Sequence, residues 1–286
     1  WIEPPDAAGE PASLRCAYHG WRYGSDGRCF DVPAMPDGPI PPRACAQSFD
    51  AQVAYDLVWV RIDPAGGTRI PPNPGFGEAT MHTVPGTPYT WGVGAARRVE
   101  NFTDLPHFAW VHDGTLGNRD DPVPQLPAIR REDGELRFEF DPPDMETDPT
   151  ALFGMSRYRV PLPLTVDIEF ELDTGARRRL WMTASPVRDG VSRTFWCVSR
   201  DDDPDGDDDE HLDFQRIVLE QDEPVVTNQV PPELSLAPGF EVSLRPDRVS
   251  IEYRRWLREL AVAAAGDPAS IGPALGATEP VPVGSA

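Results

Sequence analysis

The chain has 286 residues, of which 40% are hydrophobic and 26% are charged, values that suit one large globular domain or two modest ones. Its formal net charge is −21, and its 26 basic residues are all arginine, which argues against nucleic-acid binding and excludes a Walker-A or Schiff-base lysine. No apolar run is long enough to predict a membrane span, and the first residues lack the basic and apolar parts of a signal peptide.

The first 63 residues have the pattern of a small all-β domain. Short runs with strand character alternate with turns rich in Gly, Asp and Pro, and Asp26-Gly27 is a hairpin signal. Residues 52–63 are predicted to form a further strand, because β-branched and aromatic side chains dominate them. Pro and Gly are dense in the chain that follows, so residues 64–90 are predicted to be a connecting segment.

Residues 91–264 are predicted to form an α+β domain, in which helices pack on an antiparallel sheet. The periodicity predicts helices over 99–110, 212–223 and 247–260, and strands over 134–142, 157–172, 178–187 and 191–200. The acidic run 201–211 lacks the EF-hand pattern of a calcium site and is predicted to be a solvated loop. Residues 265–286 are rich in Ala, Gly and Pro and are expected to be a mobile tail.

The stretch ENFTDLPHFAWVHDG, residues 100–114, contains several potential metal ligands. In a helix, Asn101, Asp104 and His107 fall roughly on one face, and His112 converges on His107 if the helix bends or loosens between them. Two neutral imidazoles and one carboxylate, with open positions, form the arrangement by which non-haem Fe(II) activates oxygen. The carboxylate would come from elsewhere in the chain. The alternative is a pair of partly buried histidines that hydrogen-bond within a helix.

A second motif, CAYHGWRY, places Cys16 and His19 three residues apart, where a tight β-turn can direct both at one centre. In a Rieske [2Fe–2S] cluster one iron takes two cysteines and the other takes two histidines, and each of two loops supplies one of each. C-x-x-H alone is a weak signal. The longer pattern C-x-Y-H-G-W, followed by a Gly-rich hairpin and a Pro loop, is much more specific.

Together the two motifs resemble those of the Rieske non-haem iron oxygenases, in particular the oxygenase (alpha) subunits of the vanillate O-demethylase and phthalate-oxygenase type. The segment CAYHGWRYGSDGRCFDVP resembles their second cluster loop, and ENFTDLPHFAWVH resembles their mononuclear iron motif, E-N-x-x-D-x-x-H-x4-H. The resemblance covers most of the chain. It implies a partial all-β Rieske domain over residues 1–63, followed by a helix-grip (START-like) antiparallel-sheet catalytic domain, in which His107 and His112 bind the mononuclear iron.

The resemblance also implies roles for three further residues of the catalytic domain. Asp104 matches the aspartate that connects a cluster histidine of one subunit to an iron histidine of the next, and Asn101 matches the asparagine near the iron. The third iron ligand of the family is an Asp on a late helix, for which Asp213, Asp222 and Glu223 are candidates. Asp222 is preferred, because it matches the family's acidic pair before a Val-rich segment.

The chain departs from the family at the cluster. Cys16 and His19 match the ligands of the second loop, but the C-x-H of the first loop is absent, since only fifteen residues precede Cys16. Cys29 and Cys45 have no His two residues on and are interpreted as structural. The sequence is therefore expected to begin part-way into a Rieske domain, to hold an incomplete cluster and to be inactive on its own.

The activity implied is that of the terminal oxygenase in a multicomponent system of the cytoplasm. A reductase, with or without a ferredoxin, would carry electrons from NADH to the [2Fe–2S] cluster and then to mononuclear Fe(II), where O2 hydroxylates or demethylates an aromatic or polycyclic substrate. Because the electron path through Asp104 crosses a subunit boundary, the parent protein is expected to be a homotrimer. The four cysteines are too unevenly spread for a secreted disulfide framework, which agrees with a reducing compartment.

Two other classes stay as alternatives, a catalytically inactive helix-grip protein that binds a small ligand, and an iron-dependent hydrolase or lyase. A mere binder has no use for a facial triad, and the Cys16/His19 loop argues against an enzyme without redox chemistry. Several polar residues outside the motifs are expected at the surface, namely His82, His211, Arg97, Arg98 and Arg177–Arg179.

Overall fold

The computed structural model describes residues 2–5, 12–63, 69–140, 155–172, 174–203 and 205–266. The chain divides into two compact units, Trp1–Pro64 and Ala65–Ala286. Most of the predicted mobile tail lies outside the described residues, and its first two residues belong to the last helix. Within the described part of the chain, no helix is both long and apolar enough to cross a membrane.

The first unit contains a small antiparallel sheet and a separate hairpin. The sheet has the order β1(Ile2–Glu3), β2(Ser13–Arg15), β3(Arg22–Tyr23) and β4(Cys29–Asp31), and the hairpin pairs β5(Asp50–Ala54) with β6(Leu57–Arg61). The predicted turn at Asp26-Gly27 is confirmed, with a φ of 79° at Gly27. The single strand predicted over 52–63 is wrong, because Tyr55 and Asp56 both have a φ of 56° and reverse the chain. No glycine marks that turn, so the sequence did not indicate it.

The second unit is built on one antiparallel sheet of eight strands. Seven of its strands lie in the order β7(His82–Pro85), β14(Val191–Arg200), β13(Arg177–Arg188), β12(Thr165–Glu171), β11(Ser156–Leu162), β10(Glu135–Phe140) and β9(Arg130–Glu132), and β8(Tyr89–Trp91) also pairs with β14. The helices are α1(Ala95–Thr103), α2(Phe108–Val111), α3(Asp208–Val226) and α4(Arg248–Gly266), with a 3-10 turn at Arg245–Asp247. The α+β prediction is confirmed, although the strand predicted over 157–172 is two strands joined by a tight turn.

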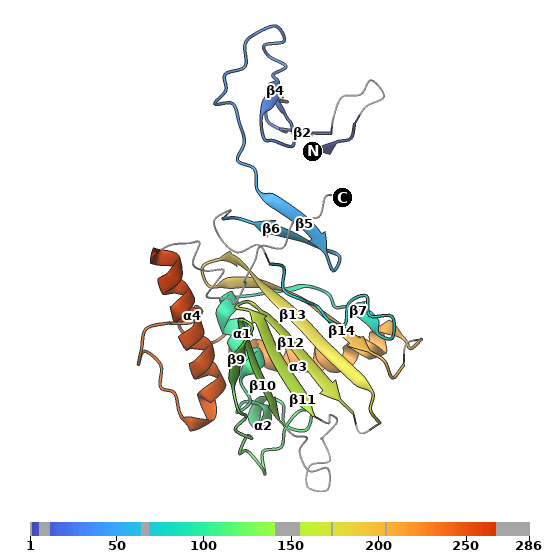
Figure 1. The fold of residues 1–286 in the computed structure, drawn as a ribbon, viewed down its shortest axis with the longest axis vertical. Coiled ribbons are helices and arrows are strands. Elements are labelled where there is room, and N and C mark those ends of the chain that lie inside the picture. The colour runs from blue at the N-terminus through green and yellow to red at the C-terminus, as the bar shows by residue number, and fades with distance from the viewer. Residues whose placement is uncertain are drawn as a thin grey trace. The chain divides into compact units, whose positions relative to one another are not determined.

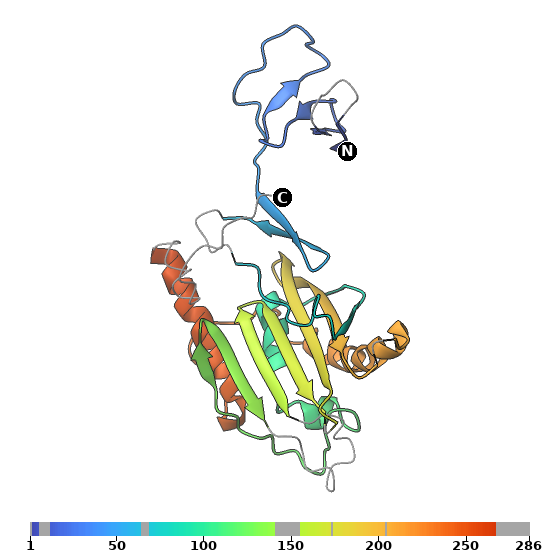
Figure 2. The same cartoon turned by 45° about the vertical axis from the view of Figure 1, so that its right-hand side comes forward.

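The helices cover one face of this sheet. Figures 1 and 2 show α1 and α3 against that face and α4 beside β9. Strand β12 shows why the sheet has two different faces: Val166, Ile168 and Phe170 alternate with polar residues and point to the helices, as the two-residue period of a strand requires. Together with Tyr253 and Trp256 of α4, which are almost fully buried, such side chains make the core of the unit.

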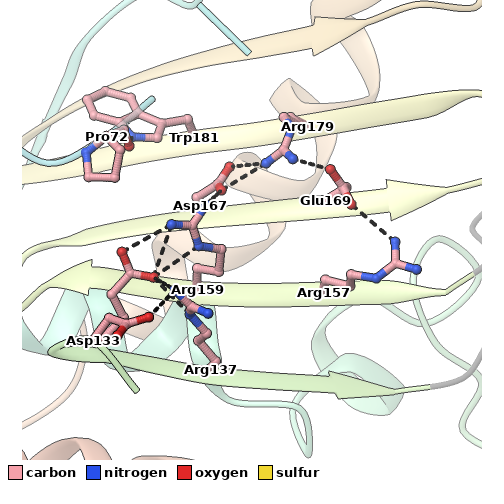
Figure 3. Close-up of polar contacts among 10 residues, drawn as sticks. Pro72, Asp133, Arg137, Arg157, Arg159, Asp167, Glu169, Arg179 and Trp181 are labelled. Atoms are coloured by element: carbon pink, nitrogen blue, oxygen red, sulfur yellow. Dashed lines mark hydrogen bonds and ion pairs between the residues drawn. The ribbon is translucent and has the colours of Figure 1, made fainter. Parts of the chain in front are cut away.

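The opposite face of the sheet carries a ladder of ion pairs instead of an apolar core (Figure 3). Asp167 is 1% exposed and accepts hydrogen bonds from Arg179 at 2.9 and 3.1 Å, while Arg159 bonds the buried Glu135. The connecting segment lies over the end of this ladder, where Trp181 donates a hydrogen bond to the carbonyl of Pro72 at 3.0 Å. The charged side chains of neighbouring strands satisfy one another's hydrogen-bonding groups on this face. The apolar layer lies on the other face, between the sheet and the helices.

The acidic run does not form the solvated loop that was predicted for all of it. Helix α3 begins at Asp208, and the side chain of Asp207 accepts hydrogen bonds from the backbone amides of Asp209 and Glu210. Carboxylates suit the first turn of a helix, because they satisfy free amides and face the positive end of the helix dipole. The helix therefore extends beyond the apolar pattern from which it was predicted.

Candidate metal centre

A break between α1 and α2 brings the two histidines of the iron motif together. Helix α1 ends at Thr103, Asp104 is extended with a φ of −86° and a ψ of 115°, and α2 starts only at Phe108. Pro106 explains the break, because proline disfavours helical backbone at the residue before it and has no amide hydrogen of its own. The continuous helix predicted over 99–110 is therefore wrong, and the bend that the convergence of the histidines requires is present.

Three donor atoms meet at this break. The Nε2 atoms of His107 and His112 are 3.3 Å apart, and Asp222 Oδ1 on α3 lies 3.6 and 3.3 Å from them. These three side chains form the one potential metal-ligand group found among the described residues. The other two candidates for the carboxylate, Asp213 and Glu223, are exposed, whereas Asp222 is 5% exposed.

The hydrogen bonds behind the rings assign the tautomer of each histidine. The Nδ1 atom of His107 lies 3.1 Å from Asp104 Oδ2, and the Nδ1 atom of His112 lies 2.8 Å from Gln221 Oε1, which also accepts from Thr115 at 3.1 Å. Both oxygens are acceptors, so both Nδ1 atoms carry the proton and both Nε2 atoms present a lone pair. Gln221 was not singled out from the sequence, where its position beside Asp222 was the one available signal.

This donor set fits a divalent metal ion. Two bare imidazole nitrogens and a carboxylate oxygen face one another within 3.6 Å, which is repulsive unless a cation lies among them. Nitrogen and oxygen donors of this kind, each held from behind by a hydrogen bond, are typical of a non-haem Fe(II) site with open positions.

The surroundings of Asp222 favour its ionised form. Burial raises the pKa of this carboxyl, but its surroundings as a whole, among them the positive charge of Arg98, whose Nη1 is 3.7 Å from Oδ2, bring the pKa below its ordinary value. Asn101 donates a hydrogen bond from Nδ2 to Oδ1 at 3.2 Å. The predicted residues Asn101, Asp104, His107, His112 and Asp222 are thus all in one place.

A largely apolar cavity of about 170 Å³ opens beside the three donor atoms, between the sheet and α3. The aromatic rings that line it are those of Phe102, Phe108, Phe140, Tyr158, Phe170 and Phe214. Polar groups reach it from α3, where Gln215 and His211 lie on the same side of the helix as Asp222, and from the sheet, where Arg178, Arg179 and Arg200 line it. A mostly apolar surface interrupted by polar groups is the usual lining of a site for a small aromatic molecule.

Three residues predicted at the surface are buried instead. His211 is 6% exposed, Arg97 is 4% exposed and Arg98 is fully buried. His211 lies in the N-terminal turn of α3, which was predicted to be a loop. The two arginines lie on α1, where carboxylate, carbonyl and aromatic groups surround them. His82, which pairs with Asp208 at 2.7 Å, is partly exposed.

Cys16 and His19 lie on one tight turn of the first unit. The backbone amide of Gly20 donates to the carbonyl of Cys16 at 3.0 Å, and Gly20 has a φ of 74°, which suits glycine. Both cluster candidates are exposed. A Rieske cluster needs two cysteines and two histidines, so the one pair on this turn does not by itself fit the complete cluster.

Comparison with known protein families gives two matches, which together span most of the chain. Residues 5–49 match the Rieske [2Fe-2S] domain, and residues 91–263 match the vanillate O-demethylase oxygenase C-terminal domain. The members of this oxygenase family use a [2Fe–2S] cluster and mononuclear iron.

Relatives and solved structures agree with these matches. The chain is 41% identical over 255 residues to methylxanthine N3-demethylase NdmB of Pseudomonas putida, and 36% identical over 253 residues to methylxanthine N1-demethylase NdmA of the same organism. These alignments cover 88% and 87% of this chain, and 71% of each relative.

The structure of P. putida NdmA with caffeine matches with a TM-score of 0.85 and 35% identity, over 93% of this chain and 77% of that one. Dicamba monooxygenase bound to dicamba, at 18% identity and a TM-score of 0.64, shares the fold over 89% of this chain and 81% of its own. With the iron motif, the two domain matches and these relatives, the chain belongs to the Rieske-type oxygenases, a family of oxidoreductases, and its catalytic region is of the vanillate O-demethylase type.

Proposed function

We propose that this chain is the oxygenase component of an N-demethylase, and that it removes a methyl group from a ring nitrogen of an N-methylated heteroaromatic compound. The observation that carries the proposal is the convergence of the bare Nε2 atoms of His107 and His112 with Asp222 Oδ1, at the edge of an apolar cavity lined by aromatic rings. The names of the relatives, methylxanthine N3- and N1-demethylase, suggest the class of substrate. The proposed catalytic domain spans residues 91–264, after a Rieske-type region (1–63) and a connecting segment (64–90).

His107, His112 and Asp222 would hold Fe(II), which when bound supplies the reductive activation of O2. The protein's own contribution is positional. Asp104 and Gln221 keep the protons of the two histidines on Nδ1, so that both lone pairs face the metal position. The aromatic rings of the cavity would hold a flat ring with its methyl group toward the three donor atoms.

The proposed reaction balances as a monooxygenation. A ring N–CH3, O2, NADH and H⁺ give the ring N–CH2OH, NAD⁺ and water, and the carbinol then divides into the ring N–H and formaldehyde. NADH supplies the two electrons through a reductase, with or without a ferredoxin. In a homotrimer, the Rieske cluster of one subunit would pass them through Asp104 to the iron site of the next. Two features of Asp104 support this role. Its carboxylate contacts His107, and it is partly exposed, so that a group of another subunit can reach it.

The test of this proposal is to measure iron and acid-labile sulfide in the protein of the full reading frame and in its His107→Ala variant. With its reductase, NADH and 1,3,7-trimethylxanthine, the unchanged protein should release formaldehyde and one demethylated xanthine. His107→Ala should lose about one iron per chain, keep its sulfide and lose turnover. His82→Ala is the matched control, since His82 pairs with Asp208 and is not one of the three proposed ligands, and it should keep the iron and the sulfide of the unchanged protein. Equal iron in the unchanged protein and in His107→Ala would refute the proposed metal ligands. It would favour a protein that binds a small molecule without catalysis.

A further inference from the structure

Arg98 is a fully buried cation in contact with the candidate metal centre. It lies on α1, three residues before Asn101, and its guanidinium carbon is 4.1 Å from the ring centre of Phe102 and 4.4 Å from that of Trp91. Burying a charge costs free energy that well-placed partners must offset. A cation in this position therefore requires a physical reason.

The hydrogen bonds of Arg98 lead toward Asp222. Its Nε and Nη2 atoms donate to the hydroxyl of Tyr89 at 3.0 and 2.8 Å, and its Nη1 atom donates to the side-chain oxygen of Asn101. The same Nη1 atom is 3.7 Å from Asp222 Oδ2. Tyr89 thus anchors one side of the planar fork, and the other side is directed at the metal ligands.

This arrangement makes the two oxygens of Asp222 different. Because Arg98 occupies the oxygen of Asn101, the amide nitrogen of Asn101 must face Asp222, and it donates to Oδ1 at 3.2 Å. Oδ1 also faces the two histidines, whereas Oδ2 faces the guanidinium.

We propose that Arg98 is a positioning residue that keeps Asp222 a one-oxygen ligand, by holding Oδ2 away from the metal and fixing the amide of Asn101 against Oδ1. The inference rests on the proposed iron site and adds to it the control of an open position. A carboxylate that binds through both oxygens fills one more position around the metal. Arg98 therefore keeps that position free for O2 or another small ligand.

The test uses Arg98→Met, which removes the fork and keeps much of the volume, in protein loaded with Co(II) in place of iron. Without the guanidinium, Oδ2 is free to bind the metal, so the visible absorption of Co(II) should weaken as its coordination number rises. Azide, a probe of the open position, should bind about tenfold more weakly, in line with the effect of removing a group that orients a ligand. Co(II) itself should stay bound, because the loss of a nearby positive charge does not oppose a cation.

Arg97→Met is the matched control. Arg97 is on the same helix and almost as buried, but its guanidinium bonds Glu241 and backbone carbonyls instead of the metal centre. This variant should lose thermal stability and keep the unchanged Co(II) spectrum and azide affinity.

Tyr89→Phe removes one hydroxyl and lowers azide affinity in the same direction by a smaller factor, so it decides the question if Arg98→Met does not fold. An unchanged spectrum and azide affinity in the folded, Co(II)-loaded Arg98→Met protein would overturn the proposal, and so would the same result in Tyr89→Phe. Failure of the unchanged protein to bind Co(II) would instead overturn the proposed iron site.

Discussion

His112 shows how much of the metal centre depends on single contacts. Its side chain is 1% exposed, its Nε2 faces His107 and Asp222, and its Nδ1 is held by Gln221. A histidine without a fixed tautomer presents a lone pair at Nε2 only part of the time, which weakens its binding to a metal. Gln221 is therefore as much a part of the site as the ligands that the motif contains.

Replacement of Gln221 by Leu should weaken metal binding without unfolding the protein. The variant loses the acceptor for His112 Nδ1, and the affinity for Fe(II) or Co(II) should fall between tenfold and a hundredfold. Titration of the metal-free protein under anaerobic conditions measures this directly. Glu220→Gln, at an exposed neighbouring position of α3, is the control, and equal affinities in the two variants would show that Gln221 does not support the site.

At the scale of elements, the break between α1 and α2 and the seating of α3 decide where the ligands lie. Pro106 ends the first helix of the motif. Helix α3 supplies Asp222, which lies 110 residues after His112 in the chain. Helix α1 is joined to the segment before α4 by Glu241, which accepts hydrogen bonds from Arg97 at 2.6 Å and from Arg254 at 2.7 Å. These pairs join α1 to α4 and contribute to the stability of their packing.

Glu241 makes the stability of this helix packing depend on pH. Hydrogen bonds from Arg97, and then from Arg254, lower its pKa from 4.5 to about 2 in the folded protein, although partial burial opposes the change. The stabilisation is therefore complete above about pH 4.5 and is lost as the pH falls toward 2. Glu241→Gln should lower the free energy of unfolding by about 1–2 kcal/mol at pH 7. Urea unfolding of both proteins at several pH values should show this difference shrinking below pH 4.5, and a constant difference would refute the assignment.

At the scale of the whole molecule, the two roles proposed for the iron motif lie on opposite sides of His107. Its Nε2 faces the metal position, and its Nδ1 faces Asp104, which is 28% exposed in its side chain. The side chain of His107 is 14% exposed, and the greater exposure of Asp104 fits the proposed transfer of electrons from another subunit.

Asp104→Asn should separate these two functions in the assembled protein. Iron should stay bound, because the side-chain oxygen of Asn still accepts the hydrogen bond from His107 Nδ1, but turnover should fall about tenfold to a hundredfold if the carboxylate connects cluster and iron. The measurement compares iron content with the rate at which substrate oxidises the prereduced cluster. Unchanged turnover with full iron would remove the connecting role of Asp104.

The amount that the sequence predicts differs between the motifs and the rest of the site. His107, His112 and Asn101 lie close together along the chain, so spacing and resemblance were enough to select them. Arg98 looked like an ordinary surface arginine, because nothing in its local pattern shows that Tyr89, Trp91 and Phe102 enclose it. The surface position predicted for His211 is wrong for a different reason. The acidic residues around it form the first turn of α3, although their pattern is typical of a solvated loop.

By itself the sequence predicted the α+β class from period and turn residues, which are local properties, and its resemblance to the family predicted the two histidines and Asp222 as ligands. The tertiary structure alone decided which oxygen of Asp222 faces the histidines, which tautomer each ring adopts and which cation lies behind the carboxylate. Those features depend on contacts between residues far apart in the chain, such as Asn101 with Asp222 and His112 with Gln221. Packing of α1 and α3 on one sheet creates these contacts, and no short stretch of sequence contains both partners.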